Sequence, residues 1–303
     1  MINVLLIMLG FIMLVVGADL LVKGSSNIAK KFKITETIIG LTIVAIGTSM
    51  PELVITISSA KAGATDLIIG NAIGSNLCNL LLILGVTTML RPIVVEEDVK
   101  TIHLPVAYLS TLAILVMGLG LFGSEPGIIN KVDGRILVIL YLIYFLYPII
   151  IEIKDVWKES RKEKTSTLNG KKVSVILSII YIIVGAVLLK YGGDLVVNEA
   201  SELAAIFGIT ERVIGLTIVA IGTALPEFVT SIIAIIKDES GLAVGNLVGS
   251  CILNSFLILG TGALITPLPF SMDFNKNLIL LAGVILFIWI SCFIRKKEHN
   301  NKV

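Results

Sequence analysis

The chain has little charge, few aromatic residues and almost no histidine. Of its 303 residues, 15% are Asp, Glu, Lys or Arg, 6% are aromatic and two are histidine. Its three cysteines stand singly in apolar segments, which excludes the paired spacings of a disulfide framework or a zinc site. The apolar segments also lack the constellations on which intramembrane proteases depend: a serine with a base, paired aspartates or a metal-binding His motif. We therefore expect no enzymatic activity, and the formal charge of +2 gives no sign of a nucleic-acid partner.

Apolar residues take the place of the missing polar ones. They make up 56% of the chain, and the mean hydropathy is +0.99, a composition that soluble domains of this length do not show. Runs long enough to cross a bilayer as helices are predicted at 3–22, 36–60, 67–90, 103–121, 132–152, 173–196, 211–236, 241–265 and 276–294. The sequence therefore predicts an all-α polytopic membrane protein with about nine transmembrane helices in a lipid bilayer.

Basic residues are distributed unequally between the two sides of the membrane. If the connection after the first predicted helix is cytoplasmic, most of the 24 Lys and Arg residues fall on the cytoplasmic side. The largest group lies in the polar stretch 154–172. Because cytoplasmic loops carry the excess of Lys and Arg, we expect the N-terminus outside and the C-terminus inside.

One apolar segment is written twice. Residues 39–52 read IGLTIVAIGTSMPE, and residues 214–227 read IGLTIVAIGTALPE. The same spacing of 175 residues relates GNAIGSNLCNLLLILG at 70–85 to GNLVGSCILNSFLILG at 245–260. The spacing divides the chain into a first repeat, 1–153, a cytoplasmic linker, 154–172, and a second repeat, 173–303.

The number of helices between the copies sets their relative direction. Five predicted helices separate each element from its copy, and because five is odd, the copies cross the bilayer in opposite directions. We expect two inverted-topology five-helix repeats, an arrangement that in secondary transporters places the binding site near the midplane. The fifth predicted helix, 132–152, has its counterpart beyond Val303, so the second repeat apparently lacks its last helix, either because the protein has none or because the sequence stops short of it.

The duplicated segment carries a proline and a glutamate in the middle of an apolar span. A carboxylate there is disfavoured by about 2.5–3.5 kcal/mol on insertion scales, so Glu52 and Glu227 require a compensating partner such as a cation. Pro51 and Pro226 have no N–H for the carbonyl four residues earlier, so each helix is expected to kink there. Freed carbonyl oxygens at membrane depth must face protein or a cavity. Carboxylate and carbonyl oxygens together suit a hard cation such as calcium.

The next predicted helix of each half supplies further oxygens. Its polar side chains recur every fourth position: Asn71, Ser75 and Asn79 in the first half, and Asn246, Ser250 and Asn254 in the second. Residues at this spacing share one helix face. Gly70 and Gly74, like Gly245 and Gly249, allow close helix approach. We expect both polar stripes to face the glutamates.

These motifs carry a family resemblance. The blocks GTSMPE with GNAIGSNLCN and GTALPE with GNLVGSCILN resemble the paired alpha-repeats of the cation/calcium exchanger superfamily, and the G-T-x-x-P-E form is similar to its sodium/calcium exchanger branch. The resemblance implies a buried site at which sodium and calcium ions compete, with alternating access to the two sides. It assigns the carboxylates as shared ligands, the threonines to calcium and two alanine backbone carbonyls to sodium. The implied ligands are Glu52, Glu227, Thr48, Thr223, Ser75, Ser250, Asn79, Asn254, Ser49, Ala45 and Ala220.

Two of these positions depart from the pattern of the family. Asn254 stands where prokaryotic and potassium-dependent relatives often have an acidic residue, which argues against potassium dependence and leaves two carboxylates in the core. Ala224 stands where the first copy has Ser49. Because this removes one hydroxyl beside an implied sodium site, we expect the halves to differ in sodium affinity.

The sequence thus predicts a sodium/calcium antiporter of a prokaryotic cytoplasmic membrane. Calcium and sodium ions are its expected substrates, and no obligate protein partner is implied. Proton/calcium exchange remains an alternative, because the same glutamates could carry protons. A cation channel is a further alternative, since carboxylates and carbonyls also build selectivity filters, but broken helices in an inverted repeat favour a carrier.

Overall fold

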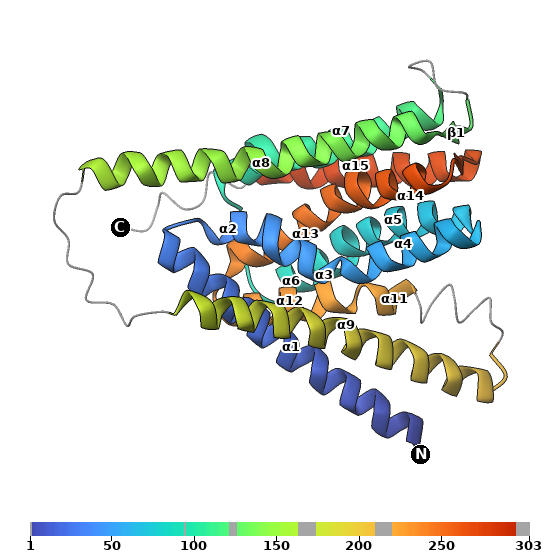
Figure 1. Cartoon of the computed structure of the whole chain (residues 1–303), viewed down its shortest axis with the longest axis horizontal. Coiled ribbons are helices and arrows are strands. Elements are labelled where there is room, and N and C mark those ends of the chain that lie inside the picture. Colours follow the sequence, from blue (N-terminus) through green and yellow to red (C-terminus); the bar gives the residue numbers. More distant parts are fainter. Residues whose placement is uncertain (1, 94, 121–125, 163–173, 210–219, 295–303) are drawn as a thin grey trace.

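The computed structural model describes residues 2–93, 95–120, 126–162, 174–209 and 220–294, with backbone alone for 152–162, Ala220 and Met272. Helices make up most of this length (Figure 1). The helices of the first half, including three π-helical segments labelled η, are α1 (Ile2–Phe32), α2 (Glu36–Ile39), η1 (Gly40–Val44), α3 (Ala45–Thr48), α4 (Met50–Ala62), α5 (Thr65–Leu77), η2 (Cys78–Ile83), α6 (Leu84–Leu90), η3 (Val99–His103), α7 (Leu104–Gly118) and α8 (Lys131–Lys162). Those of the second half are α9 (Val175–Ile206), α11 (Ala220–Thr223), α12 (Leu225–Ile236), α13 (Ser240–Leu253), η5 (Asn254–Ile258), α14 (Leu259–Ile265) and α15 (Met272–Ile294).

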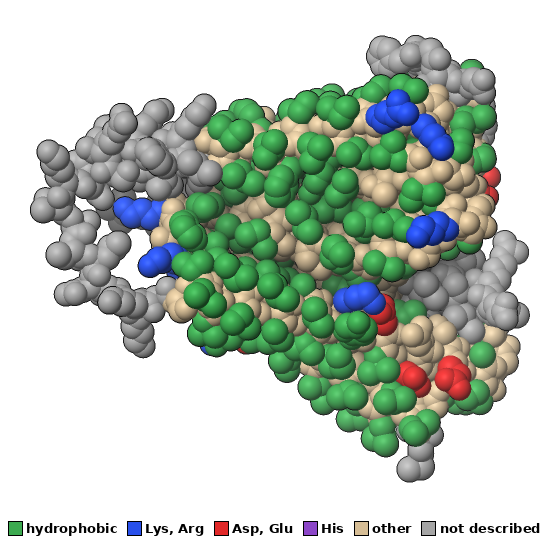
Figure 2. All heavy atoms as spheres, viewed as in Figure 1, with side chains coloured by type: hydrophobic (Ala, Val, Ile, Leu, Met, Phe, Trp, Pro, Cys, Tyr) green, Lys and Arg blue, Asp and Glu red, His purple; other side chains and the backbone are tan. Residues whose placement is uncertain are grey.

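Many of these helices are long and apolar enough to cross a bilayer. Seven satisfy this by length and composition, and the bent pair Glu36–Thr48 and Met50–Ala62 makes an eighth. Of the predicted span 211–236, the structure describes α11 and α12, and the part before Ala220 lies outside the described residues. Hydrophobic side chains cover much of the face shown in Figure 2, and most of the lysine and arginine side chains visible there lie toward its two ends. The prediction of an all-α, multi-span membrane protein is confirmed.

Helices α1 and α9 lie together along one side of the molecule (Figure 1). They run antiparallel, since Gly10 lies against Gly192 and Gly17 lies against Gly185. A Cβ added at Gly17 would lie 2.9 Å from the Gly185 carbonyl oxygen, so these helices meet backbone to backbone. Glycine at such positions permits close helix approach in membranes.

Both helices are longer than the sequence predicted. The prediction ended them at 22 and 196, whereas α1 continues to Phe32 and α9 to Ile206. The polar residues that follow the apolar run of α1 stay helical because the fold gives them partners. Ser26 and Lys30 both bind the Glu239 carboxylate, at 2.6 and 2.9 Å.

Helix α13 occupies the centre of the bundle. The apolar window of Ser240–Ile265 is 94% buried, whereas that of α1 is 28% buried. Helix α13 approaches η1 closely because glycines line the contact: a Cβ at Gly40 would lie 3.0 Å from the Gly245 Cα, and one at Gly249 would lie 2.6 Å from the Leu41 carbonyl oxygen. The predicted role in close packing is confirmed for Gly245 and Gly249. It is wrong for Gly70 and Gly74, where an added Cβ would meet nothing within 4 Å among the described residues, so the first copy of the motif does not form a helix contact there.

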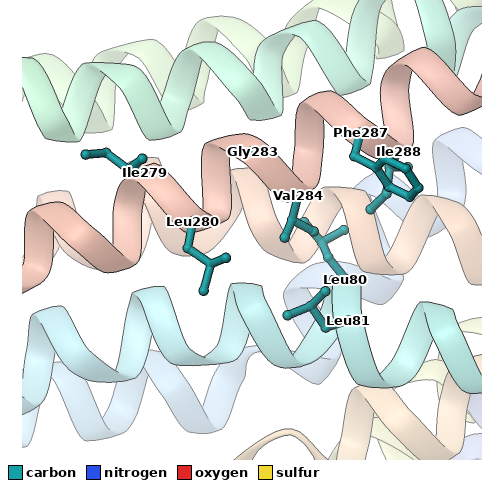
Figure 3. A pocket seen from close by; sticks show the side chains of 8 residues that line it. All are labelled: Leu80, Leu81, Ile279, Leu280, Gly283, Val284, Phe287 and Ile288. Carbon is teal, nitrogen blue, oxygen red and sulfur yellow. The ribbon is translucent and has the colours of Figure 1, made fainter.

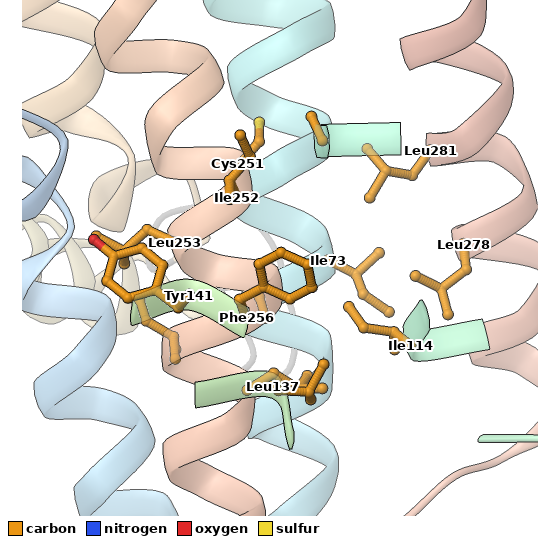
Figure 4. Close-up of a cluster of buried hydrophobic side chains, with 14 of the residues drawn as sticks. Ile73, Ile114, Leu137, Tyr141, Cys251, Ile252, Leu253, Phe256, Leu278 and Leu281 are labelled. Atoms are coloured by element: carbon orange, nitrogen blue, oxygen red, sulfur yellow. The ribbon is translucent and has the colours of Figure 1, made fainter. Parts of the chain in front are cut away.

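A large apolar core joins α5 and α13 to the layer formed by α7, α8 and α15. Figure 4 shows its side chains, among them Ile73, Ile114, Leu137, Phe256 and Leu278, converging from these helices and η5. A short antiparallel pair of strands, β1 (Ile128–Ile129) and β2 (Leu268–Pro269), ties the connection before α8 to the one before α15. This core holds the second polar stripe of the sequence against the first half of the chain.

The polar segment between the halves is partly helical. The sequence predicted a linker over 154–172, but α8 continues as far as Lys162. Residues 163–173 lie outside the described part of the chain. The apolar pattern of the predicted helix ends near Ile151, and the charged residues that follow extend the same helix.

Candidate functional site

Both intramembrane glutamates follow a break in the helix. Ser49 leaves helical geometry at φ −88° and ψ 11°, and Ala224 does so at φ −88° and ψ 0°. The helices on either side of Ser49 are bent by 46°. Proline lies at the start of both α4 and α12, where its missing N–H costs no hydrogen bond. The break predicted from Pro51 and Pro226 is confirmed in both copies.

Both glutamate side chains are buried and incompletely satisfied. Glu52 and Glu227 are each 1% exposed, and the Oε2 atom of each has no hydrogen-bond partner. The two carboxyl groups lie close enough for their charges to interact. Transferring an ionised carboxylate from water into a protein interior without a compensating charge costs on the order of several kcal/mol, even after the protein relaxes around it. The arrangement therefore requires a positive charge or a proton at this position.

Ser49 connects the two halves of the site. Its hydroxyl donates to Glu227 Oε1 at 2.9 Å and also lies 3.0 Å from Ser250 Oγ. A serine at the start of a helix commonly caps the helix with its own hydroxyl. Ser49 makes no such bond to α4, because its hydroxyl is used across the interface instead. On the other side, Ser75 interacts with Glu52.

A second contact between the halves involves Thr48 and Asn246. Thr48 Oγ1 lies 3.0 Å from Asn246 Oδ1 and 3.2 Å from the Val44 carbonyl oxygen. The amide nitrogen of Asn246 donates to Ser231 Oγ at 3.4 Å. Thr48, Asn246, Ser231 and the Val44 carbonyl therefore form one buried polar cluster. Ser231 lies on the same helix as Glu227. Asn246 and Ser250 of the second polar stripe thus contact Thr48 and Ser49 of the first repeat, and the orientation of both stripes toward the glutamates stays a prediction.

Asn79 and Asn254 lie on π-helical turns. η2 begins one residue before Asn79, and η5 begins at Asn254. Such turns are rare and often mark functional sites, because they re-aim a side chain within a helix. The Oδ1 atoms of both asparagines are buried and have no hydrogen-bond partner. These oxygens are available to a ligand.

The remaining predicted residues differ in what the structure shows of them. Ala45 is buried, but its carbonyl oxygen accepts the Ser49 N–H at 3.0 Å, so the helix break does not free it. Ala220 and Thr223 are the first and last residues of α11, and the Ala220 side chain is not described. Thr223 stands at the position that matches Thr48 in the repeat.

Two hydroxyl residues near the glutamates were missed from the sequence. Thr56 and Ser231 each lie one helical turn after a glutamate, at positions that match in the repeat, and both are fully buried. Thr56 Oγ1 has no hydrogen-bond partner, and Ser231 Oγ accepts from Asn246. The signal that could have found them is a hydroxyl four residues after each glutamate in both copies.

The donor set consists of oxygen atoms. Carboxylate, amide and hydroxyl oxygens surround the two helix breaks, and within the described ranges no group of three or more His, Cys, Asp or Glu residues could hold a metal ion. Neutral oxygens with two carboxylates are ligands for hard cations rather than for zinc or copper. The site is therefore suited to hard cations.

An apolar groove on the surface is separate from this site. It is lined by Leu80, Leu81 and six residues of α15, including Ile279, Val284 and Phe287. Figure 3 shows these side chains between α15 and η2, without a polar group among them. The groove offers no ligand to a cation.

Comparison with known proteins assigns the chain to a family. Residues 2–150 and 177–302 match the family model described as sodium/calcium exchanger protein. The chain belongs to this family. As a sodium/calcium exchanger family member, it is a transporter of the cation/calcium exchange class.

The relatives of this exchanger family member match it over nearly their full length. It is 32% identical to inner membrane protein YrbG of Escherichia coli (strain K12), over 94% of this chain and 88% of YrbG. It is also 32% identical to sodium/calcium exchanger MaX1 of Methanosarcina acetivorans, over 96% of this chain and 91% of MaX1. A solved structure of the sodium-calcium exchanger NCX_Mj, soaked with Na⁺ and Ca²⁺, is similar with a TM-score of 0.82 and 31% identity, over 96% of this chain and 90% of that one.

Proposed function

We propose that this protein exchanges sodium for calcium across a prokaryotic cytoplasmic membrane by alternating access. The ions compete for a midplane site built on Glu52 and Glu227. The observation that carries this proposal is the pair of buried carboxylates, each with an oxygen that lacks a hydrogen-bond partner. The proposed ligands are Glu52, Glu227, Thr48, Thr223, Ser49, Ser75, Ser250, Asn79, Asn254 and the carbonyls of Ala45 and Ala220.

Competition follows from the charge of the site. Two carboxylates balance one calcium ion, and sodium ions balance them only when more than one is bound. Because calcium and sodium require the same oxygens, one ion set must leave before the other binds. The site is neutral only when ions are bound, so the protein can change the side to which the site is open only in its ion-bound states.

The inverted repeat is part of this proposal, and three observations support it. The contact between Gly10 and Gly192 has its counterpart, at a spacing of 175 residues, in the contact between Gly185 and Gly17. Reciprocal contacts of this kind are expected of two-fold related elements. Asn76 and Cys251, which are also 175 residues apart, hydrogen-bond to each other, as residues on a two-fold axis would. The family model matches the two halves as separate segments.

The topology and boundaries complete the proposal. The first repeat spans 1–153 and the second 173–303, with an outside N-terminus favoured by the basic residues near 154–172. The name of the relative YrbG as an inner membrane protein supports a prokaryotic cell membrane.

Proton/calcium exchange is the second candidate. An unpartnered carboxyl oxygen in a buried site can take a proton as well as a cation. The two functions differ in the driving gradient, because a pH gradient without sodium drives calcium uptake only in the proton exchanger.

The test is calcium uptake into proteoliposomes loaded with sodium. We expect uptake that follows the sodium gradient, and its loss to background in Glu52→Gln and Glu227→Gln. Glu97→Gln, which changes an exposed glutamate with a side chain 62% exposed, is the matched control and should retain uptake. Wild-type uptake that is indifferent to sodium would overturn the proposal, and single-channel currents would indicate a channel instead.

A further inference from the structure

Asn76 lies at the boundary between the halves but outside the polar stripe that contains Ser75 and Asn79. It is 2% exposed, and all its side-chain hydrogen bonds go to the second half. Its Nδ2 donates to the Cys251 carbonyl oxygen at 3.1 Å and to Ser255 Oγ at 3.0 Å. Its Oδ1 accepts from Asn254 Nδ2 at 3.1 Å.

These bonds fix which way the Asn76 amide points. The backbone carbonyl of Cys251 can only accept a hydrogen bond, so the amide atom that faces it must be Nδ2. Rotating the amide by half a turn would place Oδ1 against that carbonyl oxygen and leave two buried acceptors in contact. The orientation of Asn76 is therefore set by the main chain of α13.

The orientation of Asn254 follows from that of Asn76. Because Asn76 presents Oδ1, Asn254 must present Nδ2 to it. The Oδ1 atom of Asn254 then faces away, and it is buried without a hydrogen-bond partner. An unsatisfied buried acceptor is unfavourable unless something else supplies the missing partner.

Asn254 is linked to the Glu227 carboxylate through the second polar stripe. It follows Ser250 by one helical turn on the same face, and Ser250 lies 3.0 Å from Ser49, which donates to Glu227. We propose that Asn76 is a positioning residue that holds the Asn254 amide with its carbonyl oxygen toward the transported cation. This role rests on the proposed function, because it concerns a ligand of that same site.

The first half lacks this device. By the spacing of the repeat, Cys251 stands in the place of Asn76, and Asn79 in the place of Asn254. A thiol is a weak hydrogen-bonding group and cannot select one face of an amide. Asn79 lies beside the Cys251 thiol, and neither of its amide atoms has a hydrogen-bond partner. Asn254 is therefore oriented by its hydrogen bond to Asn76, whereas Asn79 has no equivalent bond to a backbone-oriented amide.

The experiment is a double-mutant cycle on sodium-driven calcium uptake in proteoliposomes. Asn76→Ala is expected to raise the calcium KM about 2- to 12-fold, the range for losing one net hydrogen bond, while the maximal rate changes less. In the Asn254→Ala background, Asn76→Ala should have no further effect on KM. Glu97→Gln, at the exposed glutamate, is the control and should leave KM within about twofold of the wild type.

The outcomes separate this role from the function itself. Additive effects of Asn76→Ala and Asn254→Ala, in a wild type that responds to sodium, would overturn the positioning role and leave the exchange function intact. A wild type that does not respond to sodium would overturn the exchange function. If Asn76→Ala does not reach the membrane folded, Asn76→Ser replaces it in the cycle, with the same two outcomes.

Discussion

The surroundings of Glu52 and Glu227 differ although the segments that carry them are almost identical. Both glutamates are buried to the same extent after equivalent helix breaks. The Ser49 hydroxyl donates a hydrogen bond to Glu227, whereas Ala224, at the matching position, has no hydroxyl that could donate to Glu52. A single oxygen atom therefore makes the two halves of the site inequivalent, and a duplicated motif does not imply a duplicated site.

The ends of α1 and α9 differ in a similar way. α1 is tied to the second half by two ion pairs, Asp19 with Lys237 at 2.5 Å and Lys30 with Glu239 at 2.9 Å. In α9, Asp194 pairs with Lys190 of the same helix. The positions that match Lys30, Lys237 and Glu239 are all alanine: Ala205, Ala62 and Ala64. Within the described residues, the C-terminal half of α1 is therefore anchored by pairs that have no equivalent on α9.

The largest expected effect comes from removing the Ser49 hydroxyl, which makes the two halves of the site equal. Ser49→Ala deletes the donor to Glu227 and leaves both glutamates without a serine from the opposite half. A hydrogen bond to a charged group contributes about 1.5–3 kcal/mol, so sodium affinity should fall roughly ten- to a hundredfold. Sodium dependence of calcium uptake measures this. Ser58→Ala, on the exposed face of the same helix, is the control, and equal behaviour of the two variants would contradict the role of Ser49.

A second test concerns a region where the halves should behave alike. Gly17→Ala and Gly192→Ala stand at matching positions, and each added Cβ would lie 2.9 Å from a backbone oxygen of the facing helix. Overpacking of this kind costs about 1–3 kcal/mol, so both variants should lower the thermal unfolding temperature by a similar amount.

The control for the glycine test is Gly283→Ala. A Cβ at Gly283 meets nothing within 4 Å, and replacing a helical glycine without strain stabilises by about 0.4–1 kcal/mol. An unfolding temperature that falls for Gly17→Ala but not for Gly192→Ala would argue against the two-fold relation of α1 and α9.

The converse of the serine deletion has a smaller expected effect. Ala224→Ser places a hydroxyl at the position that matches Ser49 in the repeat. A neutral hydrogen bond contributes about 0.5–1.5 kcal/mol, so sodium affinity should rise about 2- to 12-fold. The same uptake assay measures this affinity. An unchanged sodium affinity would show that a hydroxyl at position 224 does not contribute to ion binding at Glu52.

The smallest expected effect belongs to the ion pairs of α1. Lys237→Ala removes the partner of Asp19, and because both side chains are partly exposed, we expect a loss of about 0.2–1 kcal/mol that decreases further in salt. Hydrogen exchange in the C-terminal half of α1 should become faster, whereas Lys190→Ala should leave α1 unchanged. Equal exchange rates in the two variants would remove this difference between the halves.

The pair of Glu239 also predicts a pH dependence. Burial opposes ionisation of Glu239, but hydrogen bonds from Glu36, Ser26 and Lys30 outweigh it and lower its pKa. A carboxyl group with a lowered pKa stabilises the fold at neutral pH, and this contribution is lost as the pH falls through the lowered pKa. Protection from exchange at the end of α1, expressed relative to the intrinsic exchange rate at each pH, should therefore fall on acidification, and unchanged protection would contradict the contact.

Much of the fold and part of the site were predictable because they depend on local composition and on repetition. Apolar length predicted the spans, the two prolines predicted the helix breaks, and repetition identified the glutamates and the Asn-Ser-Asn stripes. Repetition missed Asn76 and Ser255, because their matching positions are Cys251 and Leu80. A residue whose matching position in the other repeat carries a different side chain cannot be found by comparing the two repeats.

The sequence by itself determined that the protein is a helical membrane protein with two carboxylates in two copies of one motif, because apolar length and an intramembrane charge have the same physical meaning in any fold. The tertiary structure decided which oxygens meet. Ser49 hydrogen-bonds to Glu227, Asn79 and Asn254 lie on π-helical turns, and the Cys251 carbonyl accepts a hydrogen bond from Asn76. Hydrogen bonds depend on distances of about 3 Å and on which atom faces which, and between segments far apart in the chain only the packing of the helices determines these.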